Sequence, residues 1–164
     1  MIELHRFRSK DGKYGLSLPA GAVALMLAEA KEAQGRETGG ILVGLYNVDL
    51  DTAIVTVAAA PPPDSAKAHS TFWRGVVGVK EMLQNLWQKP IRTYYLGEWH
   101  VHPNFSAERS DLDDETMCGS ELRTSFNCAV PILVILGGDP HSTWHLQAWA
   151  YPQGQRPVPM LPEA

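Results

Sequence analysis

The sequence predicts an α/β fold in which helices flank a mixed β-sheet, and three observations support this prediction. Apolar runs of strand length recur along the chain, two longer segments place apolar residues at helical spacing, and the two kinds of segment are mixed without strict β-α-β alternation. The chain has 164 residues, which is enough for one compact domain with a sizeable core. Its 45% apolar and 20% charged residues are ordinary for a globular protein.

The first part of the chain predicts a strand, a helix and a hairpin. Residues 2–8 alternate loosely, as a half-buried strand does. Residues 18–35 predict a helix, because apolar residues share one face, Pro19 suits the first turn and Gly35 suits a left-handed stop. Residues 37–63 contain two β-rich runs around a polar turn. We expect a hairpin whose almost wholly apolar first strand is central in the sheet.

The middle of the chain predicts a long loop and a second helix. Residues 61–73 begin with three consecutive prolines and predict a loop. Loops of this length inside a compact domain are often functional. From about Trp73 to Gln88, apolar residues recur at helical spacing, and Pro90 ends the predicted helix.

The last part of the chain predicts strands, a short helix and a tail. The predicted strands are residues 93–102, 128–138 and 143–152, and the short helix is residues 110–122. Residues 153–164 are rich in proline and predict a poorly ordered tail. Residues 1–152 would then form a single domain.

Charge and cysteine usage limit the partners and the compartment. With 14 basic and 18 acidic residues the net charge is −4, which argues against nucleic acid as a partner, because phosphate binding usually needs a basic face. Cys118 and Cys128 form no disulfide framework and suit a reducing compartment. The N-terminus shows no signal-peptide core, and no stretch is long and apolar enough to cross a bilayer. We therefore expect a cytoplasmic protein with neither a membrane nor a nucleic-acid partner.

The strongest chemical signal is the pair His100 and His102, which follows a predicted strand. Residues two apart on a strand share one face, about 6–7 Å apart, so both imidazoles can converge on one ion. A catalytic zinc ion takes three protein ligands and keeps a fourth position for water. The third ligand would come from the aspartates that follow, Asp111, Asp113 or Asp114.

Helix capping ranks these aspartates. If Ser110 is the N-cap of the short helix, Asp113 stands at N3, on the same side as the cap. Ser110 and Asp113 would then face the histidines together, while Asp111 points elsewhere and Asp114 remains the main competitor. A zinc site also needs a base. Glu98 shares the strand face of the histidines, and Glu37 stands at the mouth of a very apolar strand.

These residues together resemble a known motif. Glu37 followed by TGGILVG, then GEWHVHP, then Ser110 and Asp113, resembles the JAMM (MPN+) zinc metalloprotease motif, including its Prok-JAB branch. Ser110 is the seventh residue after Pro103, and Asp113 is the eleventh after His102, which are the family spacings. The resemblance implies a JAMM/MPN (cytidine-deaminase-like) sandwich. Valine stands here where the family often has serine between the histidines, at a position that should face the core.

The resemblance also implies roles. His100, His102 and Asp113 would bind Zn²⁺ with water as the fourth ligand, Glu37 would be the general base, and Ser110 would stabilise the oxyanion. The family cleaves the isopeptide bond after the C-terminus of a ubiquitin-like protein, often ending in Gly-Gly. Its bacterial members include proteins of antiphage defence systems. The expected partner is therefore a ubiquitin-like C-terminal tail or its conjugate.

Three alternatives accompany this interpretation. A zinc deaminase would need His-x-Glu and Pro-Cys-x-x-Cys, and this chain has neither. A non-catalytic JAMM-like module could bind a ubiquitin-like partner, although such relatives typically lack the ligands present here. The enzyme could also process a precursor rather than a conjugate. In either case, residues 61–73 and 104–109 are our candidates for the walls of the substrate groove.

Overall fold

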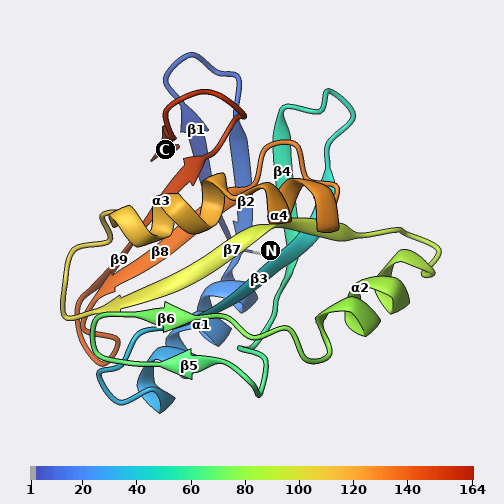
Figure 1. The fold of residues 1–164 in the computed structure, drawn as a ribbon. Helices are drawn as coiled ribbons and strands as arrows, with labels where there is room; N and C mark the ends of the chain where they lie inside the picture. Colours follow the sequence, from blue (N-terminus) through green and yellow to red (C-terminus); the bar gives the residue numbers. More distant parts are fainter. Residues whose placement is uncertain (1–2) are drawn as a thin grey trace.

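The computed structural model describes residues 3–164 and contains an eight-stranded sheet that closes on itself (Figure 1). Its strands are Leu4–Ser9 (β1), Gly15–Pro19 (β2), Thr38–Tyr46 (β3), Thr52–Ala58 (β4), Tyr94–Pro103 (β7), Ile132–Gly138 (β8), Trp144–Ala150 (β9) and Val158–Pro162 (β10). Around the sheet the order is β1-β10-β9-β8-β7-β3-β4-β2, and β2 pairs back with β1. The pairs β2–β4 and β7–β8 are parallel and the others are antiparallel, so the predicted mixed sheet is confirmed.

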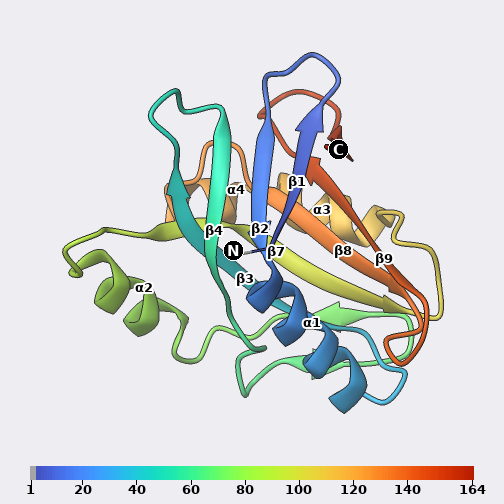
Figure 2. The same ribbon diagram turned by 180° about the vertical axis from the view of Figure 1, so that it is seen from behind.

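Helices and one small hairpin lie outside this sheet. They are Ala20–Glu32 (α1), Val79–Trp87 (α2), Asp111–Cys118 (α3), Ser120–Ser125 (α4), and the strands Ala66–Lys67 (β5) and Phe72–Trp73 (β6). Helix α1 packs against β2, β3, β4 and β7, and Figure 2 shows it on the side opposite α3 and α4. The flanking helices confirm the predicted α/β class. No helix in the described part of the chain is long and apolar enough to cross a membrane.

Two apolar cores lie on opposite faces of the central strands. Trp99 and Val101 of β7 pack in the first core with Met26 of α1. Ile135 of β8 packs in the second core with Met117 of α3. Because successive side chains of a strand point to opposite faces, the two histidines of β7 face the side on which α3 lies. Val101 therefore faces the core, as the sequence predicted.

The hairpin at residues 37–63 is confirmed, since β3 and β4 pair antiparallel. Strand β3 is central, with β4 on one side and β7 on the other, and its residues 38–44 are buried. This explains the continuous apolar run, because a strand covered on both faces has no polar side. Strand β8 is also covered on both faces, and its residues 132–137 are buried.

Two predictions for the middle of the chain need correction. The second helix begins at Val79 rather than near Trp73, because Trp73 belongs to β6 and Gly78, with a left-handed φ of +83°, is the N-cap of the helix. The predicted loop at residues 61–73 contains the two-residue strands β5 and β6, which pair with each other. In addition, the predicted short helix is interrupted at Gly119, which separates α3 from α4.

The prediction of a poorly ordered tail is wrong for Val158–Pro162. This segment is β10, which pairs with both β1 and β9, and Met160 is buried in the first core. Prolines suggested disorder, but a short strand tolerates them where no ladder N–H is needed. At the other end of the chain, residue 2 of the predicted first strand lies outside the described residues.

Candidate metal centre

Strand β7 presents His100 and His102 on one face of the sheet. The strand is held on both sides, since His100 lies opposite Gly39 of β3 and opposite Ile135 of β8. Both histidines are largely buried, with exposures of 8% and 7%. A rigid, doubly paired strand therefore fixes the spacing of the two imidazoles.

Helix α3 brings Asp113 to these imidazoles. Nδ1 of His100 lies 2.8 Å from Oδ1 of Asp113, and Nε2 of His102 lies 3.3 Å from Oδ2. Burial raises the pKa of Asp113, but the hydrogen bonds from His100 and His102 outweigh it and hold this pKa well below its ordinary value. Burial opposes the charged form of His102, yet its contact with Asp113 raises the pKa of His102 overall. The contact thus favours a negative charge on Asp113 and a positive charge on His102.

The start of α3 is the capping box that the sequence predicted. The Ser110 hydroxyl accepts a hydrogen bond from the Asp113 N–H at 3.1 Å, and the Asp113 carboxylate accepts one from the Ser110 N–H at 2.8 Å. The Ser110 side chain is exposed beside the buried carboxylate, so its hydroxyl hydrogen can point to a bound molecule.

Asp114 and Asp111 do not join the cluster. Asp114 accepts a hydrogen bond from the Tyr151 hydroxyl at 2.7 Å and forms an ion pair with Arg109. It therefore ties α3 to the end of β9 and to the preceding loop. Asp111 is exposed.

The loop between His102 and Ser110 folds back over β8. A side chain at Gly137 would clash with this loop, because a Cβ there would lie 2.5 Å from the backbone nitrogen of Ala107. The Ala107 N–H donates to Nε2 of His145 on β9 at 3.1 Å. His145 was not singled out in the sequence analysis. No local signal marks this role, since it depends on a contact between distant segments.

Glu37 lies beside the histidines. It precedes Thr38, which pairs with Val101, so it stands next to His102 across the β3–β7 ladder. Burial raises the pKa of Glu37, and the Asp113 carboxylate adds to the rise, while His102 offsets part of it. Its half-buried carboxylate is therefore within electrostatic reach of the other groups of the cluster.

The side chains of His100, His102 and Asp113 are of the types that bind Zn²⁺, although here they contact one another directly. Two imidazoles and a carboxylate are ligands typical of catalytic zinc. In the part of the chain that the structure describes, no three such side chains are spaced so that they could hold a metal ion as they stand. Asp113 instead contacts both imidazoles directly, with one carboxylate oxygen 2.8 Å from His100 and the other 3.3 Å from His102. Metal binding would exchange these contacts for bonds to the ion.

Residues 64–77, which we call the flap, also reach this cluster. The two flap residues whose contacts matter here, Phe72 and Arg74, were not singled out in the sequence analysis. The Phe72 ring meets the His100 ring edge-on, with centroids 5.7 Å apart. Arg74 forms a salt bridge at 2.8 Å with Glu98, the acid two residues before His100. The Glu98 carboxylate is therefore engaged by an arginine.

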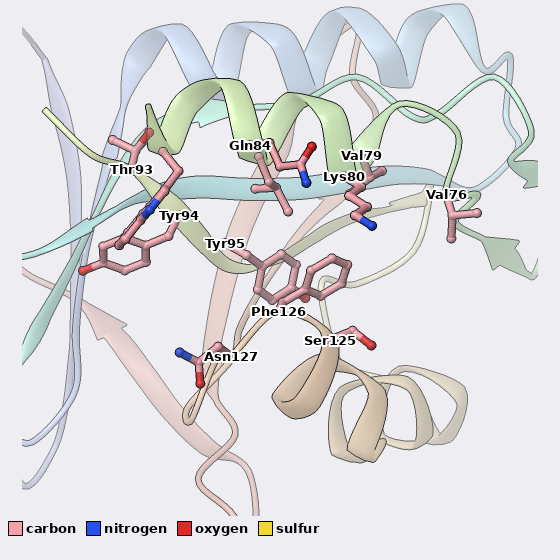
Figure 3. Close-up of a pocket in the computed structure, with 12 residues that line it drawn as sticks. Val76, Val79, Lys80, Gln84, Thr93, Tyr94, Tyr95, Ser125, Phe126 and Asn127 are labelled. Atoms are coloured by element: carbon pink, nitrogen blue, oxygen red, sulfur yellow. The ribbon is translucent and has the colours of Figure 1, made fainter. Parts of the chain in front are cut away.

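A separate groove of about 600 Å³ lies between α2, β7 and the residues that end α4 (Figure 3). Tyr95 and Phe126 stack in it with ring centroids 4.4 Å apart, and Val79 of α2 borders it. None of the five predicted site residues lines this groove. The candidate centre is thus the cluster on β7 and α3, not this hollow.

Comparisons with known proteins agree with the fold and with the family resemblance. A family model described as prokaryotic homologs of the JAB domain (Prok-JAB) matches residues 19–150. A CD-NTase/cGAS isopeptidase of Enterobacter hormaechei subsp. hoffmannii is 36% identical over 152 residues, which cover 93% of this chain and 83% of that protein. A probable metalloprotease of Sinorhizobium fredii is 23% identical over 134 residues, which cover 80% of each protein.

Among solved structures, the solution structure of a protein from Desulfitobacterium hafniense has a similar fold. Its TM-score is 0.58 at 17% sequence identity, and the match covers 87% of this chain and 86% of that chain. At this identity the likeness concerns the fold alone.

Proposed function

This chain belongs to the family of prokaryotic homologs of the JAB domain, and within that family we propose that it is a zinc-dependent isopeptidase or peptidase. It would cleave after the C-terminus of a ubiquitin-like protein or tail. The observation that carries the proposal is the contact of both imidazoles, His100 and His102, with the buried Asp113 carboxylate, with Glu37 beside them.

In this proposal each residue has one task. His100, His102 and Asp113 would hold Zn²⁺ as neutral imidazoles and a carboxylate. When bound, the ion supplies Lewis acidity, which makes water nucleophilic near pH 7 and polarises the scissile carbonyl. Glu37 accepts the proton of the attacking water and passes it to the leaving amine. A raised pKa suits this task, because it makes the carboxylate a stronger base toward the proton that it takes up.

Ser110 would donate its hydroxyl hydrogen to the oxyanion of the tetrahedral intermediate. We expect Ser110→Ala to lower kcat by about 10²–10³-fold, as is typical when one oxyanion donor is lost. Zinc content should stay near wild type, because the Asp113 carboxylate keeps its hydrogen bond from the Ser110 backbone N–H. Elemental analysis beside steady-state kinetics would check this. Loss of the metal in this variant would give the serine a structural role instead.

The substrate tail would lie between the flap and residues 104–109. Exposed aromatic rings stand on both segments, since Trp73 is 67% exposed and Phe105 is 70% exposed. An extended tail could add as a strand to the edge of the small β5–β6 sheet, with main-chain hydrogen bonds supplying affinity. A narrow groove of this kind would accept small residues next to the scissile bond.

Replacing the terminal Gly-Gly of a substrate tail with Ala-Ala should therefore stop cleavage. The added methyl groups would meet the groove walls and displace the scissile carbonyl, and a misplacement of about 1 Å can cost about 10²-fold in rate. Matched fluorogenic tails would measure the effect in one assay. Equal turnover of both tails would rule out a groove that selects glycine.

We further propose that this chain acts in the cytoplasm within a bacterial antiviral system. The relative from Enterobacter is named for a CD-NTase/cGAS target, which supports a conjugated protein as the substrate. The net charge of −4 is consistent with a protein partner rather than nucleic acid or a membrane. The proposed peptidase activity is tested by incubation with a lysine-linked conjugate and with a C-terminally extended precursor, each with and without a chelator. Failure to cleave either substrate in the presence of Zn²⁺ would refute it.

A second candidate is a JAMM-like module that binds a ubiquitin-like partner without chemistry. In that case the contacts of Asp113 with His100 at 2.8 Å and with His102 at 3.3 Å would hold α3 against β7 and have only a structural role. Calorimetric titration with Zn²⁺ separates the two candidates. A stoichiometric metal site supports the enzyme, and a protein that binds a ubiquitin-like tail but no metal supports the module.

A further inference from the structure

The flap is a closed loop whose two ends are tied together. The Asp64 carboxylate accepts hydrogen bonds from the N–H groups of Val76 at 2.9 Å and Val77 at 3.0 Å. Next to it, the Ser65 hydroxyl accepts one from the Gly75 N–H at 2.9 Å. A Cβ at Gly75 would lie 2.0 Å from the Asp64 carboxylate, so only glycine allows this closure.

The closed flap touches the candidate centre on two sides. The Ala68 carbonyl accepts a hydrogen bond from the Glu37 N–H at 2.6 Å, which fixes the backbone of the proposed base. On the other side, the Phe72 ring packs edge-on against the His100 ring. Both rings lie close to Gly39, where a Cβ would come within 3 Å of each of them. The flap therefore bears on the proposed base and on one proposed ligand.

Pairing within the flap is too short to hold it in place. Strands β5 and β6 pair through two residue pairs, and an isolated two-stranded hairpin is at best marginally stable. The flap is therefore held by anchors to the body of the protein, of which the Ala68 and Phe72 contacts are two.

Arg74 supplies such an anchor. Its Nε atom donates to both oxygens of Glu98, at 2.8 and 3.1 Å, and its Nη1 donates to the Gly75 carbonyl at 2.8 Å. The side-chain exposures are 12% for Arg74 and 1% for Glu98, so water competes little for this pair. A cavity of about 270 Å³ beside the pair is also lined by Phe72 and His100, which places the anchor and the proposed ligand around one space.

We propose that Arg74 is a positioning residue of the centre. Its buried ion pair with Glu98 holds the flap against β7, and the flap in turn fixes the His100 ring and the backbone of Glu37. This inference rests on the proposed function, because it assigns His100 and Glu37 to a zinc centre. It adds a means by which a segment outside the ligand set controls their geometry.

The test uses variants that avoid an unpaired buried charge. The pair is neutralised in the double variant Arg74→Met/Glu98→Gln, and Arg74→Lys keeps the charge without the planar fork. Arg8→Gln is the matched control, since Arg8 pairs with Glu163 outside the flap. Amide hydrogen exchange of residues 64–77 and of Glu37 is measured in each protein, together with Zn²⁺ affinity by competition with a chromogenic chelator.

In the double variant we expect amide exchange in the flap and at Glu37 to be at least about tenfold faster, while the core strands β8 and β9 remain protected. Zn²⁺ affinity should fall by about 10–100-fold, as is usual when a partner behind a metal ligand is lost. Arg74→Lys should lie between wild type and the double variant. The Arg8→Gln variant should match wild type in both measurements.

Unchanged flap exchange, or a Zn²⁺ affinity within a few-fold of wild type, would overturn the anchor. General unfolding of the double variant would appear as faster exchange in β8 and β9. In that case the test uses Arg74→Lys instead: faster flap exchange with weaker Zn²⁺ binding supports the anchor, and wild-type values of either one overturn it. A wild-type protein that binds no Zn²⁺ would instead refute the proposed function on which the inference rests. If the wild type does bind Zn²⁺ and the double variant binds it equally well, the proposed function stands and only the role of Arg74 is refuted.

Discussion

The variant His102→Ala is expected to lose both Zn²⁺ binding and all measurable cleavage. In the wild type, the His102 imidazole is one of three proposed ligands, and it is buried, 3.3 Å from the Asp113 carboxylate. A zinc site reduced to two protein ligands loses most of its affinity, and the Lewis acid leaves with the ion. Treatment of the wild type with a chelator should give the same loss of activity, and added Zn²⁺ should restore it.

Thermal unfolding provides a readout of this loss that does not depend on the substrate. A ligand that binds the native state alone stabilises it, by about 2.7 kcal/mol at a concentration 100-fold above its Kd. Zn²⁺ should therefore raise the Tm of the wild type and leave that of His102→Ala unchanged. His141→Ala, a change at an exposed histidine outside the cluster, is the control and should behave as wild type. A zinc-dependent rise in Tm that survives in His102→Ala would remove this residue from the ligand set.

Much of the site could be predicted because its signals are local. The spacing of His100 and His102 on one strand fixes their common face, and the capping box places Asp113 rather than Asp111 on the side of the histidines. Asp114 was the remaining competitor. Its hydrogen bond from Tyr151 joins segments 37 positions apart, so only the folded structure reveals its role as an anchor for α3.

The features that the sequence did not predict depend on non-local pairing. Strand β10 exists because β1 and β9 both offer an edge to residues 158–162, and proline content alone concealed this. Sheet closure is likewise a relation between the two ends of the chain. The same holds for Arg74, whose buried partner is 24 positions away, and for His145, which holds a loop 38 positions away. Neither residue belongs to a motif with fixed spacing.

Replacing Glu37 should separate chemistry from metal binding. We expect Glu37→Ala and the isosteric Glu37→Gln to keep the Zn²⁺ content of wild type, because neither change touches the three proposed ligands. Cleavage should fall by about 10²–10⁴-fold, the usual contribution of a positioned general base. The backbone hydrogen bond from the Glu37 N–H to Ala68 survives both substitutions, so the flap should remain in place.

Glu32→Gln, at an exposed position at the end of α1, is the matched control for the loss of one carboxylate from the same region of the chain, and it should retain full activity. Metal content by elemental analysis and kcat on a lysine-linked conjugate would be measured on the same preparations. If Glu37→Gln cleaves at the wild-type rate, another group takes the proton and Glu37 leaves the mechanism. If Glu37→Gln loses the metal, its carboxylate acts as a ligand or supports one, and proton transfer must be assigned elsewhere. Retained zinc with a collapsed kcat would identify the half-buried carboxylate beside His102 as the group that moves the proton.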